Sequence, residues 1–311
     1  MNKITFFLIL AAYSFALFSC EKNSLAQSEK IPAVDNSRQS VPSAPPNDFS
    51  VPKGWTLFPK PKEGSPEMRC ANYSVEREWK VETENGNLKI SKYAYSADEQ
   101  IEKLPLNLRQ TILKNRNVGK GLGGYLYIES FEKGWLIGSD AGEWGGKLFW
   151  FSENGNHKTE LLKDNIRGIA RVADEIFILS GMRHLGIDEG KIFKLAKDEK
   201  GSLKVQFLID LKTQPQTFTA KNDQSTVIAV NNKIVRLKSS GEIENLRETN
   251  FSSLYPNSMT ITSSKVIYVG MRLFIVRFMQ GENGFTEEWL MPQNCQKFRE
   301  KNFDCACQNE K

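Results

Sequence analysis

The first stretch whose side chains could do chemistry is "GSDAGEWGG", residues 138–146. Asp140 and Glu143 stand beside Trp144 in this stretch, between glycines. Two nearby carboxylates are the groups that cleave glycosidic bonds, and acid clusters also hold Ca²⁺. The ordinary interpretation is that Asp140 bonds the backbone of a turn, as Asp often does, and that Trp144 fills a gap between neighbouring sheets.

A second polar stretch, "SGMRHLGIDEG" (180–190), contains Arg183, His184 and Asp188 between glycines. Further along the chain come Asn231, the "LYPNS" turn and Arg272. The ordinary interpretation is that the two arginines only pair with Asp188 and Glu143, which adds little stability across exposed loops. The turn contributes Tyr255, Pro256 and Asn257.

The inventory favours binding over catalysis. The chain has two histidines, His157 and His184, so the usual general bases and metal ligands are scarce. No nucleophile elbow and no Cys-His zinc pattern stands out, and the sequence predicts no metal and no cofactor. Lys and Arg total 42 against 37 acids and are spread along the chain, so nucleic acid is not an expected partner.

The elements that position these residues repeat along the chain. From Gly123, Ile166, Pro215 and Pro256 the same order recurs: apolar strand, turn, strand, connection, strand, polar turn, strand. Four units of about 40 to 50 residues, each with four short strands, are typical of β-propeller blades. A single four-stranded sheet has two apolar faces, and it can bury both only against adjacent sheets. This need explains why such sheets repeat around a common axis.

The expected fold is therefore all-β, a β-propeller of four-stranded blades. The hairpin at 76–96, with its turn at Asn85 and Gly86, predicts part of a further blade. Five blades are favoured, with six blades or an incomplete ring as alternatives, and a two-domain arrangement is also considered. Residues 101–114 are ambiguous, although Pro105 argues against one continuous helix.

The fold predicts where the polar residues meet. In a propeller the connections from second to third strand, and from each blade to the next, emerge on one face. The connections of the first two units are enlarged, and those of the other two are tight. The predicted ligand-binding set on this face is Asp140, Glu143, Trp144, Arg183, His184, Asp188, Tyr255, Asn257 and Arg272, with Asn231 and Pro256 beside them.

The first 19 residues have the layout of an export signal. Lys3 precedes an apolar run too short to serve as a mature membrane span. Residues 17–20, "LFSC", resemble the lipobox of bacterial lipoproteins, which implies that Cys20 is acylated, with palmitate among its chains, and becomes the mature N-terminus. An ordinary secreted protein is the alternative. Glu21 resembles the residue that sends proteobacterial lipoproteins to the outer membrane.

The expected organisation is a signal peptide (1–19), a lipidated tether (20–52) and a single propeller-like domain (53–311) with a cysteine-containing tail. The tether is rich in Ser, Pro, Asn and Gln and has no periodic apolar face. The implied location is the cell envelope, on an outer membrane facing the periplasm, with exposure at the cell surface as an alternative.

The cysteines predict disulfides in an oxidising compartment. If Cys20 carries lipid, Cys70, Cys295, Cys305 and Cys307 remain, and they allow three pairings. A bridge between Cys305 and Cys307 would close a strained small loop, so we expect Cys70 to pair with one of the three C-terminal cysteines. A four-thiolate zinc site is the competing interpretation, although the usual spacing is absent.

The motifs "SDAGEWGG", "GMRHLG", "LYPNS", "IYVGMR" and "EWLMPQNC" resemble a poorly characterised group of exported bacterial lipoproteins with propeller-like repeats. The resemblance implies a fold and a location and brings no catalytic residue. By analogy, the expected function is a lipid-anchored scaffold or binding propeller for a protein or envelope ligand, such as an immunity lipoprotein that neutralises a toxin. A carboxylate-dependent envelope-glycan hydrolase or lyase and a structural spacer are the alternatives.

Overall fold

The repeated apolar segments form antiparallel strands, as their alternation predicts. The computed structural model describes residues 50–295 apart from 75–76, 118–119, 220–223 and 252, all within one unit, 45–311. Strands such as β5 (Gly134–Asp140) and β13 (Ser225–Val230) are buried on both alternations because each sheet face meets another layer.

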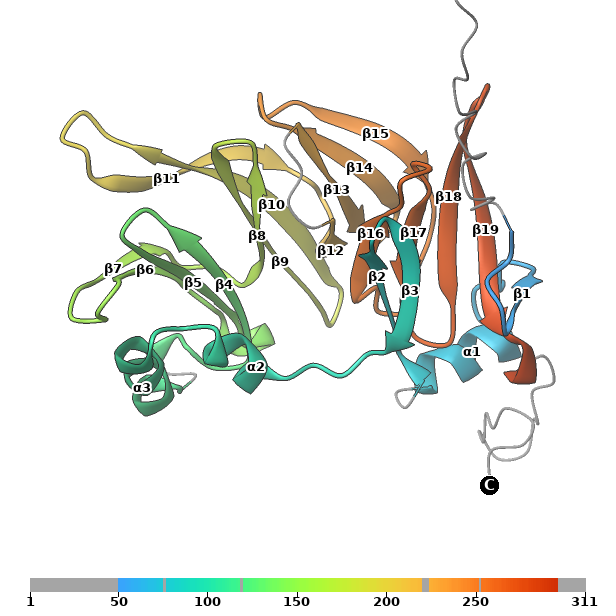
Figure 1. Cartoon of the computed structure of the whole chain (residues 1–311), viewed down its shortest axis with the longest axis horizontal. Coiled ribbons are helices and arrows are strands. Elements are labelled where there is room, and N and C mark those ends of the chain that lie inside the picture. The colour runs from blue at the N-terminus through green and yellow to red at the C-terminus, as the bar shows by residue number, and fades with distance from the viewer. Residues whose placement is uncertain (1–49, 75–76, 118–119, 220–223, 252, 296–311) are drawn as a thin grey trace, which may run out of the picture. The chain divides into compact units, whose positions relative to one another are not determined.

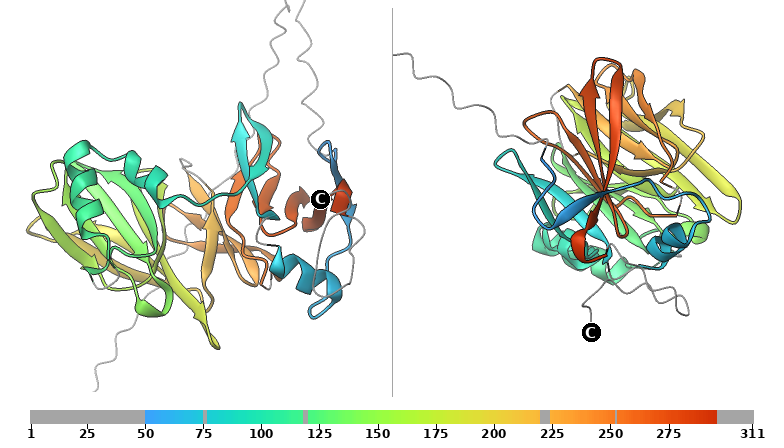
Figure 2. Two further views of the ribbon diagram at one scale, coloured as in Figure 1. Left: turned by 90° about the horizontal axis from the view of Figure 1, so that it is seen from below. Right: turned by 90° about the vertical axis from the view of Figure 1, so that its right-hand side faces the viewer.

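The described strands make four large sheets, shown in Figures 1 and 2. Blade 1 contains β4 (Tyr125–Phe131), β5, β6 (Leu148–Ser152) and β7 (Lys158–Leu162). Blade 2 contains β8 (Ile166–Val172), β9 (Glu175–His184), β10 (Ile187–Lys197) and β11 (Leu203–Asp210). Blade 3 contains β12 (Pro215–Phe218), β13, β14 (Lys233–Lys238) and β15 (Ile243–Glu248).

Blade 4 contains β16 (Ser258–Ile261), β17 (Ile267–Gly270), β18 (Ile275–Gly281) and β19 (Gly284–Pro292), with β1 (Trp55–Phe58) added at its outer edge. These sheets coincide with the four repeats read from the sequence. The prediction of a β-propeller with four-stranded blades is confirmed.

Apolar side chains between consecutive blades form the core. Leu136 and Ile178 belong to the cluster between blades 1 and 2, and Phe177 and Val235 belong to the cluster between blades 2 and 3. Phe274 lies in the cluster that joins blades 3 and 4 and also includes residues of helix α1 (Pro66–Tyr73). Each sheet thus covers its neighbour's apolar face, which is the physical reason for the repetition.

The upstream unit differs from the four blades. Among the described residues it has two strands, β2 (Trp79–Glu84) and β3 (Asn87–Lys92), whose hairpin packs on the outer apolar face of blade 4. The turn is at Asn85 and Gly86, both with positive φ, as predicted. In the described residues, β3 is followed by helices and not by further strands of the same sheet. The described part of the chain therefore fits the predicted alternative of an incomplete ring better than five full blades.

Two helices cover the free face of blade 1. α2 (Ala97–Glu102) and α3 (Leu106–Asn115) pack Ile101 and Leu108 against the blade. Pro105 separates the two helices because it is the N-cap of α3, where its missing N–H costs nothing. This confirms the expectation of a broken helix at that residue.

One connection was wrongly predicted to be an enlarged loop. Residues 180–190 extend the paired strands β9 and β10 to a two-residue turn at Leu185 and Gly186. The glycines at 181 and 190 suggested a loop, yet they stand opposite each other in the ladder. Gly190 must lack a side chain because a Cβ there would lie 2.0 Å from the carbonyl oxygen of Thr213.

The predicted export signal, the predicted lipidation site Cys20 and the predicted tether up to residue 49 lie outside the described residues, as do Cys305 and Cys307. Cys70 in α1 and Cys295 in η4 (Gln293–Cys295) are both buried. The pairing of the cysteines therefore stays a prediction. Within the described part of the chain, no helix is long and apolar enough to cross a membrane.

Candidate functional site

A large cavity of about 1210 Å³ receives side chains from all four blades and from the segment that joins β3 to α2. Its lining includes every member of the predicted ligand-binding set, namely Asp140, Glu143, Trp144, Arg183, His184, Asp188, Tyr255, Asn257 and Arg272. Pro256 also lines the cavity, and Asn231 is bonded to a lining arginine. The connections between the second and third strands, and those between blades, were expected to share one face of the propeller. The residues selected by this rule do line one cavity.

Asp140, at the end of β5, is one of the two most deeply buried charges of the cavity. It accepts hydrogen bonds from Arg167 on β8 and, at 2.9 Å, from the backbone N–H of Gly142. The side chains of Asp140 and Arg167 are 7% and 17% exposed. The turn interpretation of Asp140 is thus correct, and its second oxygen forms an ion pair that joins blades 1 and 2.

The backbone around Asp140 leaves no room for a side chain opposite it. Gly124, just before β4, has a φ of +71° and lies so close that a Cβ would be 2.0 Å from the carbonyl oxygen of Asp140. The glycine is required both by its positive φ and by this close approach. It brings the start of β4 directly against the end of β5.

A group of tyrosines beside this ion pair was missed by the sequence analysis. Tyr95 and Tyr125 have ring centroids 4.3 Å apart, and the Tyr95 hydroxyl accepts a hydrogen bond of 2.7 Å from the backbone N–H of Leu126. Burial raises the pKa of Tyr93, Tyr95 and Tyr127. These three phenols are therefore neutral at physiological pH and act as hydrogen-bonding groups rather than bases.

We call Tyr95, Tyr125, Tyr127, Asp140 and Arg167 the wall of the large cavity. The signal for the tyrosines was present in the sequence as "YAY" at 93–95 and "YLY" at 125–127. Alternate residues of a strand share a face, so the second triplet predicts two rings on one side of β4. The sequence did not show that Tyr95 of the first triplet lies against Tyr125 of the second.

We call Glu143, Trp144, His184, Leu185 and Ile187 the rim. Across the interface of blades 1 and 2, the Nε2 atom of His184 lies 3.1 Å from Glu143, and both side chains are about half exposed. Trp144 is 73% exposed, so the expectation that it fills a gap between sheets is wrong. Leu185, at the tip of the β9–β10 hairpin, is 88% exposed with a φ of +47°.

The remaining polar residues of blade 2 are tied to blade 3. Arg183 donates to Asn231 at 2.5 Å and lies 3.8 Å from Asp188. Asp188 also accepts from the hydroxyl of Thr213 at 3.0 Å and from the backbone N–H of Gln214 at 2.8 Å. These bonds hold the connection from β11 to β12 and show why a carboxylate stands there.

On blade 4, Arg272 pairs with an acid that the sequence analysis did not consider. Its Nε atom is 2.7 Å from Glu78, and its guanidinium lies 4.0 Å from the ring centroid of Tyr255. The expectation that Glu143 would pair with an arginine is wrong, because Glu143 contacts His184 instead. The buried Nδ2 atom of Asn257 has no hydrogen-bond partner among the described residues.

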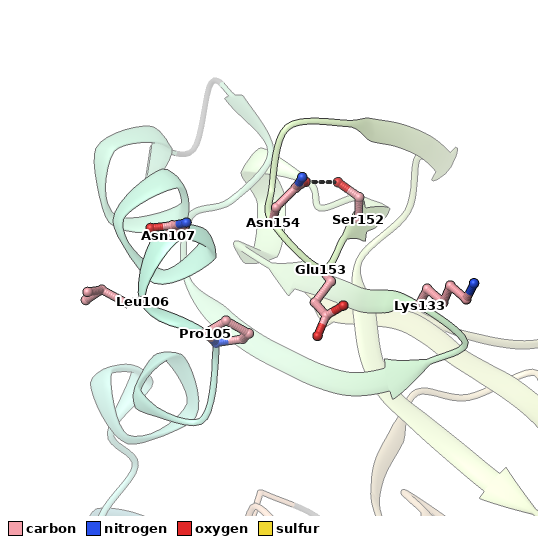
Figure 3. A pocket seen from close by; sticks show the side chains of 7 residues that line it. All are labelled: Pro105, Leu106, Asn107, Lys133, Ser152, Glu153 and Asn154. Carbon is pink, nitrogen blue, oxygen red and sulfur yellow. Dashed lines mark hydrogen bonds between the residues drawn. The ribbon is translucent and has the colours of Figure 1, made fainter.

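A second, smaller cavity of about 500 Å³ lies at the start of α3 (Figure 3). It is lined by Pro105, Leu106, Asn107, Lys133, Ser152, Glu153 and Asn154, none of which the sequence analysis selected. Asn154 and Ser152 are hydrogen-bonded to each other at 2.8 Å. Among the residues that the structure describes, no group of three or more acids, histidines or cysteines is placed to hold a metal.

Comparisons with known proteins add little to this geometry. The chain matches no protein-family model and none of the curated proteins. Similar solved structures include the extracellular domain of a hybrid two-component system from B. thetaiotaomicron, with 11% identity, 51% of this chain and 21% of that chain covered, and a TM-score of 0.38.

Two further similar structures are virginiamycin B lyase from Staphylococcus aureus and the calcium-binding protein regucalcin from Agrobacterium tumefaciens. The lyase shares 14% identity over 70% of this chain and 71% of its own, with a TM-score of 0.37. Regucalcin shares 16% identity over 53% and 59%, with a TM-score of 0.36. The chain spans about a fifth of the two-component domain, and these likenesses assign it no activity.

Proposed function

We propose that this chain is a lipid-anchored envelope protein whose propeller binds a protein or another envelope ligand through the large cavity and its rim. The observation that supports binding most strongly is the convergence of nine predicted residues from separate repeats on one cavity. A concave site with a few polar groups among aromatic side chains is the usual makeup of a ligand site.

The exposed apolar residues support the same proposal. Half of the ten large exposed hydrophobic side chains that the structure describes line the large cavity: Tyr125, Trp144, Leu185, Ile187 and Tyr255. Leaving such groups in water contributes nothing to folding, whereas clusters of them commonly mark interaction sites. A ligand could be a partner protein, including a delivered toxin.

The alternative of a hydrolase or lyase is less well supported. Asp140 already accepts hydrogen bonds on both oxygens, one from Arg167 and one from Gly142. Glu143 is the better candidate because it contacts His184 at about half exposure, and an imidazole beside a carboxylate can act as a base. Among the described residues, neither Glu143 nor His184 bonds a further acid or a nucleophilic side chain, so we favour binding over catalysis.

The anchor is part of the proposal. We place the lipid on Cys20, as palmitate and other acyl chains, and the propeller in the periplasm at the outer membrane. Mass spectrometry of the N-terminal peptide should show acylated Cys20, and a Cys20→Ser variant should leave the membrane fraction. An unmodified N-terminus ahead of residue 20 would contradict this. Reduction of the isolated protein should raise its mass by two hydrogens per disulfide.

The binding proposal is tested by capture from envelope extract with the full chain immobilised. Trp144→Ala should reduce the captured ligand at least about tenfold, because tryptophans often carry much of the energy of a binding interface. Phe207→Ala is the matched control, because this ring on β11 is 60% exposed and lies outside the cavity lining. Equal capture by the wild type and both variants would contradict the proposal.

Replacement of the acids separates binding from catalysis. For an enzyme, Glu143→Gln should abolish turnover of the captured ligand while the ligand remains bound. For a binding protein, the loss of affinity should be graded over Glu143, Trp144 and Arg183. Release of a chemically altered ligand by the wild type alone would favour the alternative.

A further inference from the structure

Every titratable Asp, Glu, Arg and His side chain that lines the large cavity, among the described residues, is already paired with another such side chain. Asp140 is bonded to Arg167, and Arg272 to Glu78 at 2.7 Å. The remaining two pairs are Glu143 with His184 at 3.1 Å and Arg183 with Asp188 at 3.8 Å. A charged ligand would have to displace one member of such a pair, whereas an uncharged ligand would displace none.

The cavity also presents aromatic rings that are partly open to solvent. Tyr125, Trp144 and Tyr255 are 47%, 73% and 50% exposed. The guanidinium of Arg272, 4.0 Å from the centroid, holds the Tyr255 ring against blade 4. A fixed and half-exposed ring provides a flat apolar surface with a hydroxyl at its edge.

Two residues beyond Tyr255, the side-chain amide of Asn257 has one atom that is hydrogen-bonded and one that is not. The amide oxygen of Asn257 accepts a hydrogen bond of 2.8 Å from the hydroxyl of Ser258, which fixes the side chain. The Nδ2 atom of the same amide is buried and makes no hydrogen bond among the described residues. An unpaired buried donor destabilises the protein, and a ligand oxygen that accepted a hydrogen bond from it would remove this cost.

We propose that the ligand of the large cavity is a neutral oligosaccharide, an inference that rests on the proposed binding function. A pyranose ring has an apolar face of C–H groups that would stack on Tyr255, and its hydroxyl oxygens would accept from Asn257. It carries no charge, in agreement with the three closed ion pairs and with the contact between Glu143 and His184. The volume of about 1210 Å³ exceeds that of an ordinary small-ligand pocket and fits several sugar units.

The test is calorimetric titration of the full chain with neutral hexasaccharides of glucose, N-acetylglucosamine, mannose and xylose, and with hexagalacturonate as the acidic comparison. At least one neutral hexasaccharide should bind. Tyr255→Ala should weaken that binding at least about tenfold, Asn257→Ala should weaken it less, and Tyr255→Phe should retain most of it. Phe207→Ala should bind as the wild type does, and circular dichroism should confirm that each variant is folded.

Failure of all four neutral hexasaccharides at about 10 mM, or tighter binding of hexagalacturonate, would overturn the proposal. Envelope capture by Trp144→Ala and by the same variants separates the proposed binding function from the proposed saccharide ligand. If capture depends on Trp144 while no sugar binds, the binding function stands and the saccharide is wrong. If the captured ligand proves to be a protein that depends on Tyr255, a peptide occupies the site instead. If neither assay responds to any variant, both proposals fall.

Discussion

The wall and the rim of the large cavity both span the interface of blades 1 and 2, yet they differ in how their charges are held. The Asp140–Arg167 pair of the wall is nearly buried, whereas Glu143 and His184 of the rim are about half exposed. Arg167 also donates to the carbonyl oxygen of Pro215, at 3.4 Å, so the wall reaches blade 3 as well. The wall pair is therefore expected to contribute more to stability, and the exposed rim is the part that we propose contacts the ligand.

This difference matters because the two pairs look alike in the sequence. Each joins an acid of the 138–146 stretch to a basic residue of the next repeat. Removing one partner of a buried pair lowers the free energy of unfolding far more than removing one partner of an exposed pair. The remaining buried charge is then left without water or a counter-ion. Substitutions at the wall should consequently lower stability most, whereas substitutions at the rim should mainly affect ligand binding.

The largest expected effect is at the wall. Asp140→Asn leaves the Arg167 charge unpaired at low exposure, and we expect the free energy of unfolding to fall by about 3 kcal/mol. Chemical denaturation followed by circular dichroism measures this change. A loss as small as that of an exposed pair would show that the wall pair is not buried in solution.

A smaller effect at the wall is expected at alkaline pH. Burial raises the pKa of Tyr127 in the folded state above the ordinary pKa of a tyrosine, about 10. Between the unfolded and the folded pKa, the folded state binds more protons, so its stability is complete below pH 10 and falls as the pH rises beyond it. Tyr127→Phe should flatten this fall, whereas an unchanged pH dependence in the variant would place its cause elsewhere.

At the rim, one substitution should stabilise the fold. Leu185 occupies a left-handed turn position that Asn adopts more readily, and its side chain is 88% exposed. Leu185→Asn should therefore raise the free energy of unfolding by about 1 kcal/mol and, at the same time, weaken capture of the envelope ligand. Higher stability with unchanged capture would remove Leu185 from the recognition surface.

The smallest expected effect concerns the exposed pair of the rim. Glu143→Gln should change the free energy of unfolding by less than about 0.5 kcal/mol, because half-exposed pairs are screened by water and salt. The same denaturation experiment as for Asp140→Asn gives the direct contrast. A loss comparable with that at Asp140 would contradict the distinction between wall and rim.

The repeats and the common face could be predicted because both follow from local patterns. Alternating apolar residues such as those of β13 mark strands, and the order of strands within each unit determines which connections share a face. The same reasoning placed the predicted polar residues on one cavity. It also recognised the helix break at Pro105.

Pairings over long sequence distances could not be predicted. Glu78 meets Arg272 across 194 residues, and nothing in the spacing of either residue indicates the other. Tyr95, between β3 and α2, likewise reaches the start of β4 at Leu126, and the spacing of the two residues does not indicate this contact. The extension of β9 and β10 was missed because two glycines, which stand opposite each other in the ladder, imitate a loop.

The central claim is that the rim meets the ligand, and photocrosslinking in the native host tests it most directly. A p-benzoylphenylalanine in place of Trp144 should give a crosslinked adduct on irradiation, whereas the same group in place of Phe207 should give none. Adducts from both positions, or from position 207 alone, would contradict the claim that this cavity and its rim are the binding site.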